Sequence, residues 1–225
     1  MVPASLPLIP FVGRAAELGR LRAALDAGGG GSCSAVFLSG PTGVGKSRLA
    51  EAARQEARRR AWRVLEARAY PIETDLPYGL LTSAYNGLLR DLDAAALADV
   101  TRGVGPELGR VFPALAARGG GGVVAGPGTG DSDLGTPGEL RARLRWSVVE
   151  LTRNLAREQP VLLYLDDLHW GDASSLDLVH FLLRHSRDVP LCVAATRSRH
   201  SSRLSGPTGT SAATGRSSRS RSTSA

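Results

Sequence analysis

The sequence predicts an α/β fold in which a parallel β-sheet lies between two layers of helices. Short apolar segments alternate with amphipathic helical segments along the 225 residues, the order expected of parallel strands joined by helical crossovers. One apolar segment leads into a glycine-rich octapeptide at residues 40–47, and a later one ends in two aspartates, Asp166 and Asp167. Because parallel strands place their carboxyl ends at one edge of a sheet, we expect these two segments to form one site.

Residues 40–47 read Gly-Pro-Thr-Gly-Val-Gly-Lys-Ser and fit the phosphate-loop (Walker A) pattern G-x-x-x-x-G-K-[ST] at every fixed position. An apolar strand at 35–39 precedes them and a segment of helical composition at 48–60 follows, as the motif requires. The glycines let backbone N–H groups turn inward as a nest for phosphates, Lys46 reaches the β- and γ-phosphates, and Ser47 supplies a hydroxyl for Mg2+. The predicted phosphate-binding residues are Gly40, Pro41, Thr42, Gly43, Val44, Gly45, Lys46 and Ser47. The alternative is a glycine-rich turn that happens to hold a lysine and a serine.

Lysine usage supports the motif. The chain has 28 basic residues, and Lys46 is the only lysine among them. A planar guanidinium would fit the phosphate nest poorly, so the retention of a compact ammonium at this position favours a functional role.

Composition places the chain among ordinary globular proteins, with 42% apolar residues. Cys33 and Cys192 show no metal or redox spacing, which favours a reduced, cytoplasmic protein. The N-terminus has no basic region and its apolar stretch is interrupted by prolines, so we expect no signal peptide. No apolar run approaches the roughly 20 residues that span a bilayer, so we expect no membrane partner.

The charge distribution argues against a basic body. Five arginines and no acidic residue lie in residues 198–225, so these residues account for five of the +7 charges and the rest of the chain carries only +2. The tail is rich in Ser, Thr, Gly and Arg, a composition typical of disorder. It also provides the alternative function, an electrostatic arm that binds nucleic acid.

The N-terminal segment carries the first family resemblance. Residues 11–14, Phe-Val-Gly-Arg, are followed by a helix with leucines on one face and stand shortly before the phosphate loop. This arrangement resembles the N-terminal box of origin-recognition-like AAA ATPase domains and of the related STAND signalling ATPases. The resemblance implies that Val12 and Gly13 line the adenine and that Arg14 lies close to the nucleotide. A plain apolar arm that packs on the core is the alternative.

Between the phosphate loop and the two aspartates the sequence predicts one strand and several helices. The strand, at 62–69, alternates apolar and polar residues. The predicted helices span 78–92, 93–101, 107–118 and 139–157. The first three form a predicted helical insertion at about 71–135, whose last part is a glycine-rich loop.

Residues 161–167, Val-Leu-Leu-Tyr-Leu-Asp-Asp, form the second informative motif. They predict a strand that is buried on both faces and ends in two acids, which is a Walker B pattern. Mg2+ is held by few protein oxygens, so we expect Asp166 to hold the ion or its waters opposite Ser47. We expect Asp167 to orient the attacking water as a general base. Two acids that merely begin a loop are the alternative.

Two further segments extend the resemblance. The loop after the aspartates, Leu-His-Trp-Gly-Asp at 168–172, is similar to the same ATPase families, so His169 and Asp172 are candidates for the edge of the site. The apolar strand at 190–197 matches the sensor-1 strand of those families, which implies that its tip, Thr196 and Arg197, faces the γ-phosphate. A surface arginine at a strand end is the plainer interpretation.

The resemblance covers about residues 9–197 and implies a P-loop NTPase three-layer sandwich with a parallel sheet in the order 5-1-4-3-2. Beyond Arg197 no apolar period returns, so we expect the fifth strand and the helical lid to be missing, with strand 35–39 left at an exposed edge. We interpret the chain as a fragment or frameshifted version of a longer regulator, prone to aggregate. The predicted divisions are an N-terminal arm and helix at 1–30, the ATPase core at 31–197 and a disordered tail at 198–225.

The function that the motifs and the resemblance imply is ATP binding with Mg2+, and weak hydrolysis, by an AAA or STAND-type regulatory domain. Large LuxR-type transcriptional regulators use such a domain. ATP or ADP is then the ligand, self-association through the domain is expected, and DNA would be reached only through a missing effector domain. A small-molecule kinase would require a lid and a substrate pocket that the sequence does not provide.

Overall fold

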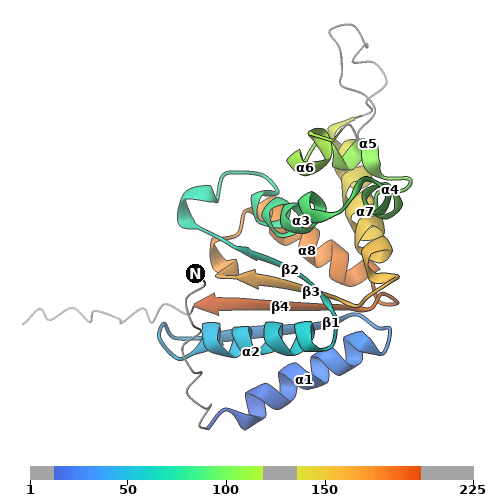
Figure 1. Cartoon of the computed structure of the whole chain (residues 1–225). Coiled ribbons are helices and arrows are strands. Elements are labelled where there is room, and N and C mark those ends of the chain that lie inside the picture. Colours follow the sequence, from blue (N-terminus) through green and yellow to red (C-terminus); the bar gives the residue numbers. More distant parts are fainter. Residues whose placement is uncertain (1–12, 119–135, 199–225) are drawn as a thin grey trace, which may run out of the picture.

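The computed structural model describes residues 13–118 and 136–198. Its centre is a parallel sheet with the strand order β1-β4-β3-β2 (Figure 1). The strands are β1 (Ser34–Gly40), β2 (Arg63–Arg68), β3 (Val161–Asp166) and β4 (Leu191–Ser198). This order agrees with the predicted arrangement at its four positions 1-4-3-2, and all four carboxyl ends lie at the same edge of the sheet.

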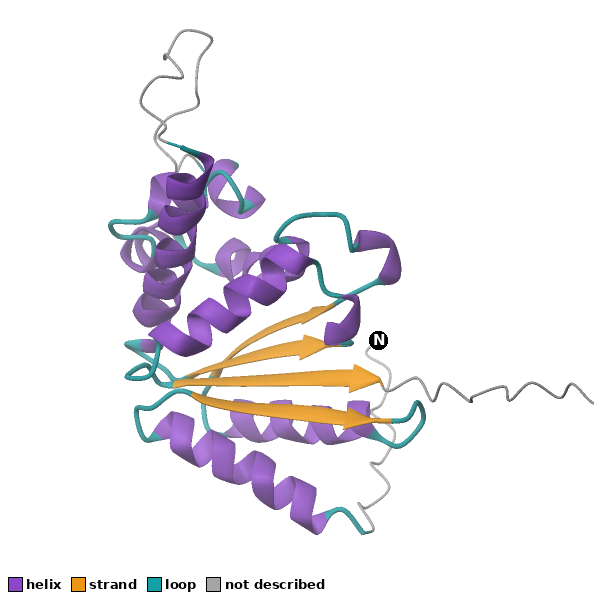
Figure 2. Cartoon of the chain, turned by 180° about the vertical axis from the view of Figure 1, so that it is seen from behind, coloured by secondary structure: helices purple, strands orange, loops and turns teal. Residues whose placement is uncertain are grey.

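Two helices cover one face of the sheet, α1 (Ala15–Gly29) and α2 (Lys46–Arg59) (Figure 2). Leu25 of α1 and Ala50 and Ala57 of α2 pack against Leu162 and Cys192 of the two central strands. Because α2 packs here, its first turn is held at the carboxyl edge of the sheet, directly after the loop that follows β1.

The other face carries a thicker helical layer. Its helices are α3 (Gly79–Asp91), α4 (Ala94–Val100), α5 (Gly105–Leu108), α6 (Pro113–Ala116), α7 (Pro137–Ala156) and α8 (Ala173–His185). Two short 3-10 turns, η1 (Pro71–Glu73) and η3 (Leu168–Trp170), lie at the carboxyl edge. The six helices and strands β2, β3 and β4 share one apolar core, with Leu81, Leu151 and Leu163 among its fully buried members.

Helix α7 shows how local sequence determines an element boundary. The Thr136 hydroxyl accepts a hydrogen bond from the Glu139 amide (3.3 Å), and the Glu139 carboxylate accepts one from the Thr136 amide (2.8 Å). Pro137 occupies the first helical position, where its lack of an N–H group costs nothing.

Strand β1 lies at an edge of the described sheet, and its burial alternates along its length. Val36 and Leu38 are half-buried against α1 and α2, whereas Ala35 and Phe37 point to the opposite face and are exposed, Phe37 by 58%. Helices α7 and α8 therefore do not extend over β1 within the described residues.

The helical prediction for 107–118 is wrong in one respect. The segment forms two short helices, α5 and α6, separated by an extended Phe112. Pro113 causes the break, because a proline disfavours helical geometry in the residue before it and cannot donate to the preceding turn.

Some predicted segments lie outside the described residues: most of the predicted arm, the glycine-rich loop and nearly all of the tail. The residues concerned are 1–12, 119–135 and 199–225. No described helix is long and apolar enough to cross a membrane.

The packing of α1 yields a stability prediction. A Cβ on Gly28 would lie 2.7 Å from Cη2 of Trp62 and 3.3 Å from the Leu191 carbonyl oxygen. Gly28→Ala should therefore lower the free energy of unfolding by about 1–3 kcal/mol. Gly19→Ala, in the same helix with no atom within 4 Å of its Cβ, is the matched control. It should leave stability unchanged or raise it by about 0.5–1 kcal/mol. Denaturant unfolding of both variants measures the difference, and equal destabilisation would contradict this account.

Candidate functional site

The loop between β1 and α2 has the backbone geometry of a phosphate nest. Gly43 and Gly45 have φ angles of 81° and 92°, in the left-handed region that glycine adopts without strain. Gly45 is also the N-cap residue of α2, so the helix begins at Lys46 with the positive end of its dipole at the loop. The loop thus directs N–H groups and a partial positive charge toward one point, which is suited to an anion.

Two cationic side chains are attached to this loop. The Lys46 ammonium donates to the carbonyl oxygens of Gly40 (3.1 Å) and Pro41 (2.9 Å), so it lies across the loop. The Arg14 guanidinium donates to the Val44 carbonyl (3.0 Å) and pairs with Glu17 (2.7 Å). The hydrogen bond from Arg14 lowers the pKa of the Glu17 carboxyl. Arg14 therefore lies beside the loop.

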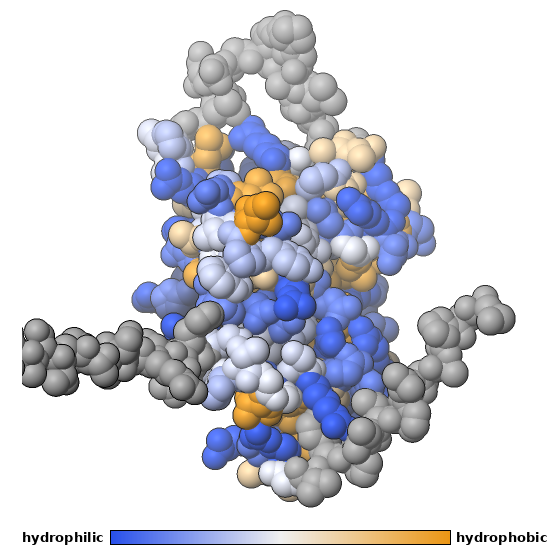
Figure 3. All heavy atoms as spheres, turned by 90° about the vertical axis from the view of Figure 1, so that its left-hand side faces the viewer, coloured by the Kyte–Doolittle hydropathy of each residue, from blue (hydrophilic) through white to orange (hydrophobic). Residues whose placement is uncertain are grey.

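A groove of about 530 Å3 runs beside the loop and along β1. Arg14, Arg20 and Lys46 contribute positive charge to its lining, and Glu17 contributes the single negative side chain. Apolar residues of β1 and α2, including Leu38 and Leu49, line the rest of the groove, so it combines cationic and apolar surfaces. Figure 3 looks onto the edge of the sheet where these residues meet, and its surface is mainly hydrophilic with small separate hydrophobic groups.

Asp166 is the last residue of β3 and faces the helical layer that contains α2. The evidence is its neighbour Tyr164, two residues earlier on the same face of the strand. The Arg54 guanidinium of α2 lies 4.7 Å from the centre of the Tyr164 ring, so this face is the one that α2 covers. Ser47 is in the first turn of α2, so Ser47 and the Asp166 carboxylate lie on the same side of the sheet, at its carboxyl edge.

Two hydroxyl groups hold the Asp166 carboxylate. Its Oδ1 accepts hydrogen bonds from the Tyr164 hydroxyl (2.8 Å) and from Thr196 Oγ1 of β4 (2.5 Å). Burial raises the pKa of Tyr164, and the hydrogen bond to Asp166 raises it further. Thr196 also accepts a hydrogen bond from the Asp167 amide (2.8 Å) and is only 1% exposed. The sequence predicted Thr196 at the tip of the last strand. The structure shows in addition that the Thr196 hydroxyl contacts both Asp166 and Asp167.

Asp167 adopts a left-handed backbone conformation with φ 52° and turns toward a different partner. Its carboxylate pairs with the Arg68 guanidinium at 2.9 Å, and Arg68 Nε also lies 3.8 Å from Asp166 Oδ2. The hydrogen bond to Asp167 raises the pKa of Arg68, so the arginine remains charged. Sequence analysis missed Arg68, because only the register that pairs Arg68 with Asp166 brings β2 to the two acids.

Arg197 and Thr196 alternate on β4 and therefore point to opposite faces of the sheet. Arg197 is exposed at the strand end and makes no ion pair with a described residue, whereas Thr196 is buried against the aspartates. Of the predicted base-binding pair, Gly13 is exposed with φ 79°, and Val12 lies outside the described residues.

Asp172, a candidate for the site edge, has a different environment. It is 3% exposed and caps α8 by accepting from the Ser175 amide (2.8 Å). It also accepts from the Tyr78 amide (2.9 Å) and the Leu80 amide (3.4 Å) at the start of α3. Asp172 therefore joins two helix N-termini of the opposite layer. His169 lies in η3 with its ring 4.9 Å from that of Trp170.

A parallel α/β sheet with a phosphate loop after its edge strand and two acids at its carboxyl edge defines the P-loop class of nucleotide-binding proteins. Comparison with family models places the chain within that class: the model described as AAA ATPase domain matches residues 10–194, and the chain belongs to this family. No curated protein matches the sequence. Family membership supports ATP binding and ATPase activity in general, and typically the use of Mg2+.

The donors at the site fit that ion. Mg2+ prefers hard oxygen ligands and retains several waters, so a hydroxyl and a carboxylate are sufficient protein ligands. Ser47 and Asp166 are the hydroxyl and carboxylate that could hold the ion, and Asp166 Oδ2 makes no hydrogen bond to a described residue.

The capping of both α3 and α8 by Asp172 yields a prediction about stability. Asp172→Ala leaves amide donors at the starts of both α3 and α8 without their acceptor, so it should cost about 3 kcal/mol of unfolding free energy. Asp93→Ala is the control, since Asp93 is exposed and caps α4 alone through the Ala96 amide (2.8 Å). It should cost about 1 kcal/mol. Chemical denaturation of both variants compares the two caps, and equal losses would show that Asp172 does not join the helices energetically.

Proposed function

We propose that the chain binds ATP together with Mg2+ at the carboxyl edge of the sheet and hydrolyses it slowly as a regulatory ATPase domain. The observation that carries this proposal is the placement of two groups. Lys46 lies across a loop whose glycines have left-handed backbone angles, and Asp166 faces α2, the helix that follows this loop. Cationic and carboxylate groups so arranged suit a polyanion that binds together with a divalent cation.

Each group at the loop has a defined part in binding. The N–H groups of residues 42–45 and of the first turn of α2 donate to phosphate oxygens, and Lys46 transfers its hydrogen bonds from the loop carbonyls to the outer phosphates. The groove beside β1 takes the nucleoside, with Arg14 at the loop end, and Gly13 is assigned to the adenine. Ser47 and Asp166 would hold Mg2+, which would neutralise phosphate charge when bound.

Hydrolysis is assigned to Asp167. Its carboxylate orients the attacking water and accepts the proton, which requires the carboxylate to leave or share its ion pair with Arg68. Arg197 is assigned to the γ-phosphate, which requires its side chain to turn around the strand end from the opposite face of the sheet. Because Arg68 forms an ion pair with the Asp167 carboxylate, this carboxylate is not free to act as the base, and slow turnover is expected.

The regulatory role rests on the resemblance to STAND signalling ATPases and to the ATPase domains of LuxR-type regulators. In this proposal the exchange or hydrolysis of ATP switches a conformation, self-association occurs through the ATPase domain, and DNA is reached only through an effector domain. The alternative, nucleic-acid binding by the Arg/Ser tail, depends on residues outside the described part of the chain.

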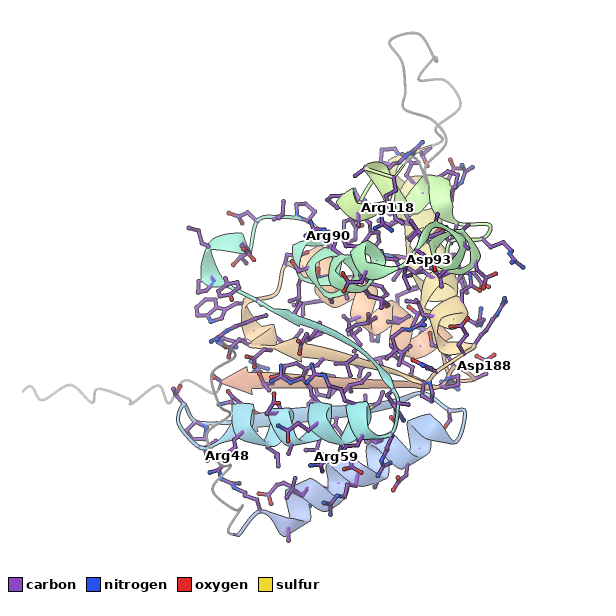
Figure 4. All side chains as sticks on the ribbon, in the orientation of Figure 1. Arg48, Arg59, Arg90, Asp93, Arg118 and Asp188 are labelled. Carbon is purple, nitrogen blue, oxygen red and sulfur yellow. The ribbon has the colours of Figure 1, made fainter. Side chains whose placement is uncertain are left out.

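Nucleotide binding is tested by calorimetry. Lys46→Ala removes the ammonium and should weaken ATP binding at least about 100-fold, because an uncompensated phosphate charge costs several kcal/mol. Arg59→Ala is the control for charge: Arg59 lies near the other end of the same helix, 76% exposed, and should leave affinity unchanged (Figure 4). Equal ATP affinity in wild type and Lys46→Ala would overturn the proposal.

Hydrolysis is tested separately by phosphate release. Asp167→Asn preserves the shape of the side chain but cannot accept the proton, so turnover should fall about 100-fold or more while ATP affinity stays within a few-fold. Asp188→Asn, an exposed carboxylate at the opposite edge of the sheet, is the control and should change neither (Figure 4). Unchanged turnover in Asp167→Asn would remove Asp167 from its assigned role.

A further inference from the structure

A tyrosine hydroxyl next to the metal-binding acid has no role in the function described so far. Tyr164 is 3% exposed, and its hydroxyl donates to Asp166 Oδ1 at 2.8 Å. Residue 164 in this strand otherwise needs only an apolar side chain, because β3 is buried on both faces. Packing therefore accounts for the Tyr164 ring but not for its hydroxyl, which donates to a carboxylate.

The position of the Tyr164 ring is fixed from the side of α2. The Arg54 guanidinium lies over the ring and pairs with Glu66 of β2 at 2.8 Å, and it also pairs with Glu51 one turn earlier in α2. Glu66 is the register partner of Tyr164 on the neighbouring strand. The ring therefore lies under a guanidinium that ion pairs hold to both α2 and β2.

The two oxygens of Asp166 are not equivalent. Oδ1 accepts from both Tyr164 and Thr196, whereas Oδ2 has only the 3.8 Å ion pair with Arg68 Nε among the described residues. With Oδ1 saturated by two hydroxyl donors, the carboxylate cannot rotate freely, and Oδ2 is the oxygen that remains for a cation or its water.

We propose that Tyr164 is a positioning residue for divalent-cation binding: its hydroxyl holds Oδ1 of Asp166 so that Oδ2 is presented to Mg2+. This inference rests on the proposed function, since it concerns the cation that accompanies ATP. Residues that hydrogen-bond to a metal-ligating side chain typically contribute about 10- to 100-fold to metal affinity. Tyr164 does not touch the nucleotide in this proposal, so its contribution is confined to the cation.

The test uses Tyr164→Phe in the full chain, which removes the hydroxyl but keeps the ring against Arg54. ATP binding is measured by calorimetry at a series of Mg2+ concentrations and in EDTA. The Mg2+ concentration that gives half of the cation-dependent gain in ATP affinity should rise about tenfold, and the affinity in EDTA should stay within twofold.

Tyr85→Phe is the matched control. Tyr85 is also fully buried, and its hydroxyl shares a 2.7 Å hydrogen bond with Thr152 Oγ1 in the opposite helical layer. The same chemical change there should leave the Mg2+ dependence at the wild-type value. A shift of the same size in both variants would show a general loss of stability and overturn the inference.

A second pair of variants tests the same oxygen without altering Tyr164. Thr196→Val removes the other donor to Oδ1 and should shift the Mg2+ dependence in the same direction, whereas Thr196→Ser keeps the hydroxyl and should restore it. Wild-type Mg2+ dependence in Tyr164→Phe would overturn the inference while leaving ATP binding intact. Failure of the wild-type chain to bind ATP at any Mg2+ concentration would instead overturn the proposed function together with the inference.

Discussion

The constraint on which the site depends is the pairing of strands around Asp166. Its carboxylate accepts from Tyr164 of its own strand and from Thr196 of β4, and it lies beside Arg68 of β2. Three strands must therefore be in register for one carboxylate to have its hydrogen bonds. A shift of one residue would move Thr196 or Arg68 to the other face of the sheet, since side chains alternate along a strand. The same register that buries the core thus assembles the acidic half of the site.

The phosphate-binding half of the site depends on local chemistry instead. Its conformation requires glycines with left-handed backbone angles at two positions, and its charge comes from Lys46 and the start of α2. Tertiary packing contributes chiefly by seating α2 on the sheet and by bringing Arg14 to the Val44 carbonyl. The two halves are connected through α2, whose Arg54 contacts the ring of Tyr164.

Asp172 gives the fold a physical link between the site and the helical layer on the far face. The loop after the two aspartates ends at this buried carboxylate, which caps α3 and α8 together. A buried carboxylate that satisfies donors of two helices cannot leave either one without exposing unpaired amides. A movement of the loop would therefore be transmitted to both helices. Within the described residues, the exposed face of β1 does not connect the site to this helical layer, because α7 and α8 do not cover it.

The sequence by itself determined the fold class, the phosphate loop and the paired acids, because glycine geometry, apolar period and strand-terminal charges are local signals. The strand order followed from the resemblance to AAA ATPase domains and not from a local pattern. It overextended one helix at 107–118, where Pro113 overrides the apolar pattern. Only the tertiary structure decided that Arg68 pairs with Asp167 and that Thr196 and Tyr164 donate to Asp166. It also decided that Asp172 caps helices α3 and α8. These contacts join residues about 30 to 100 positions apart, or depend on which face of a strand is covered, and no local pattern encodes such partners.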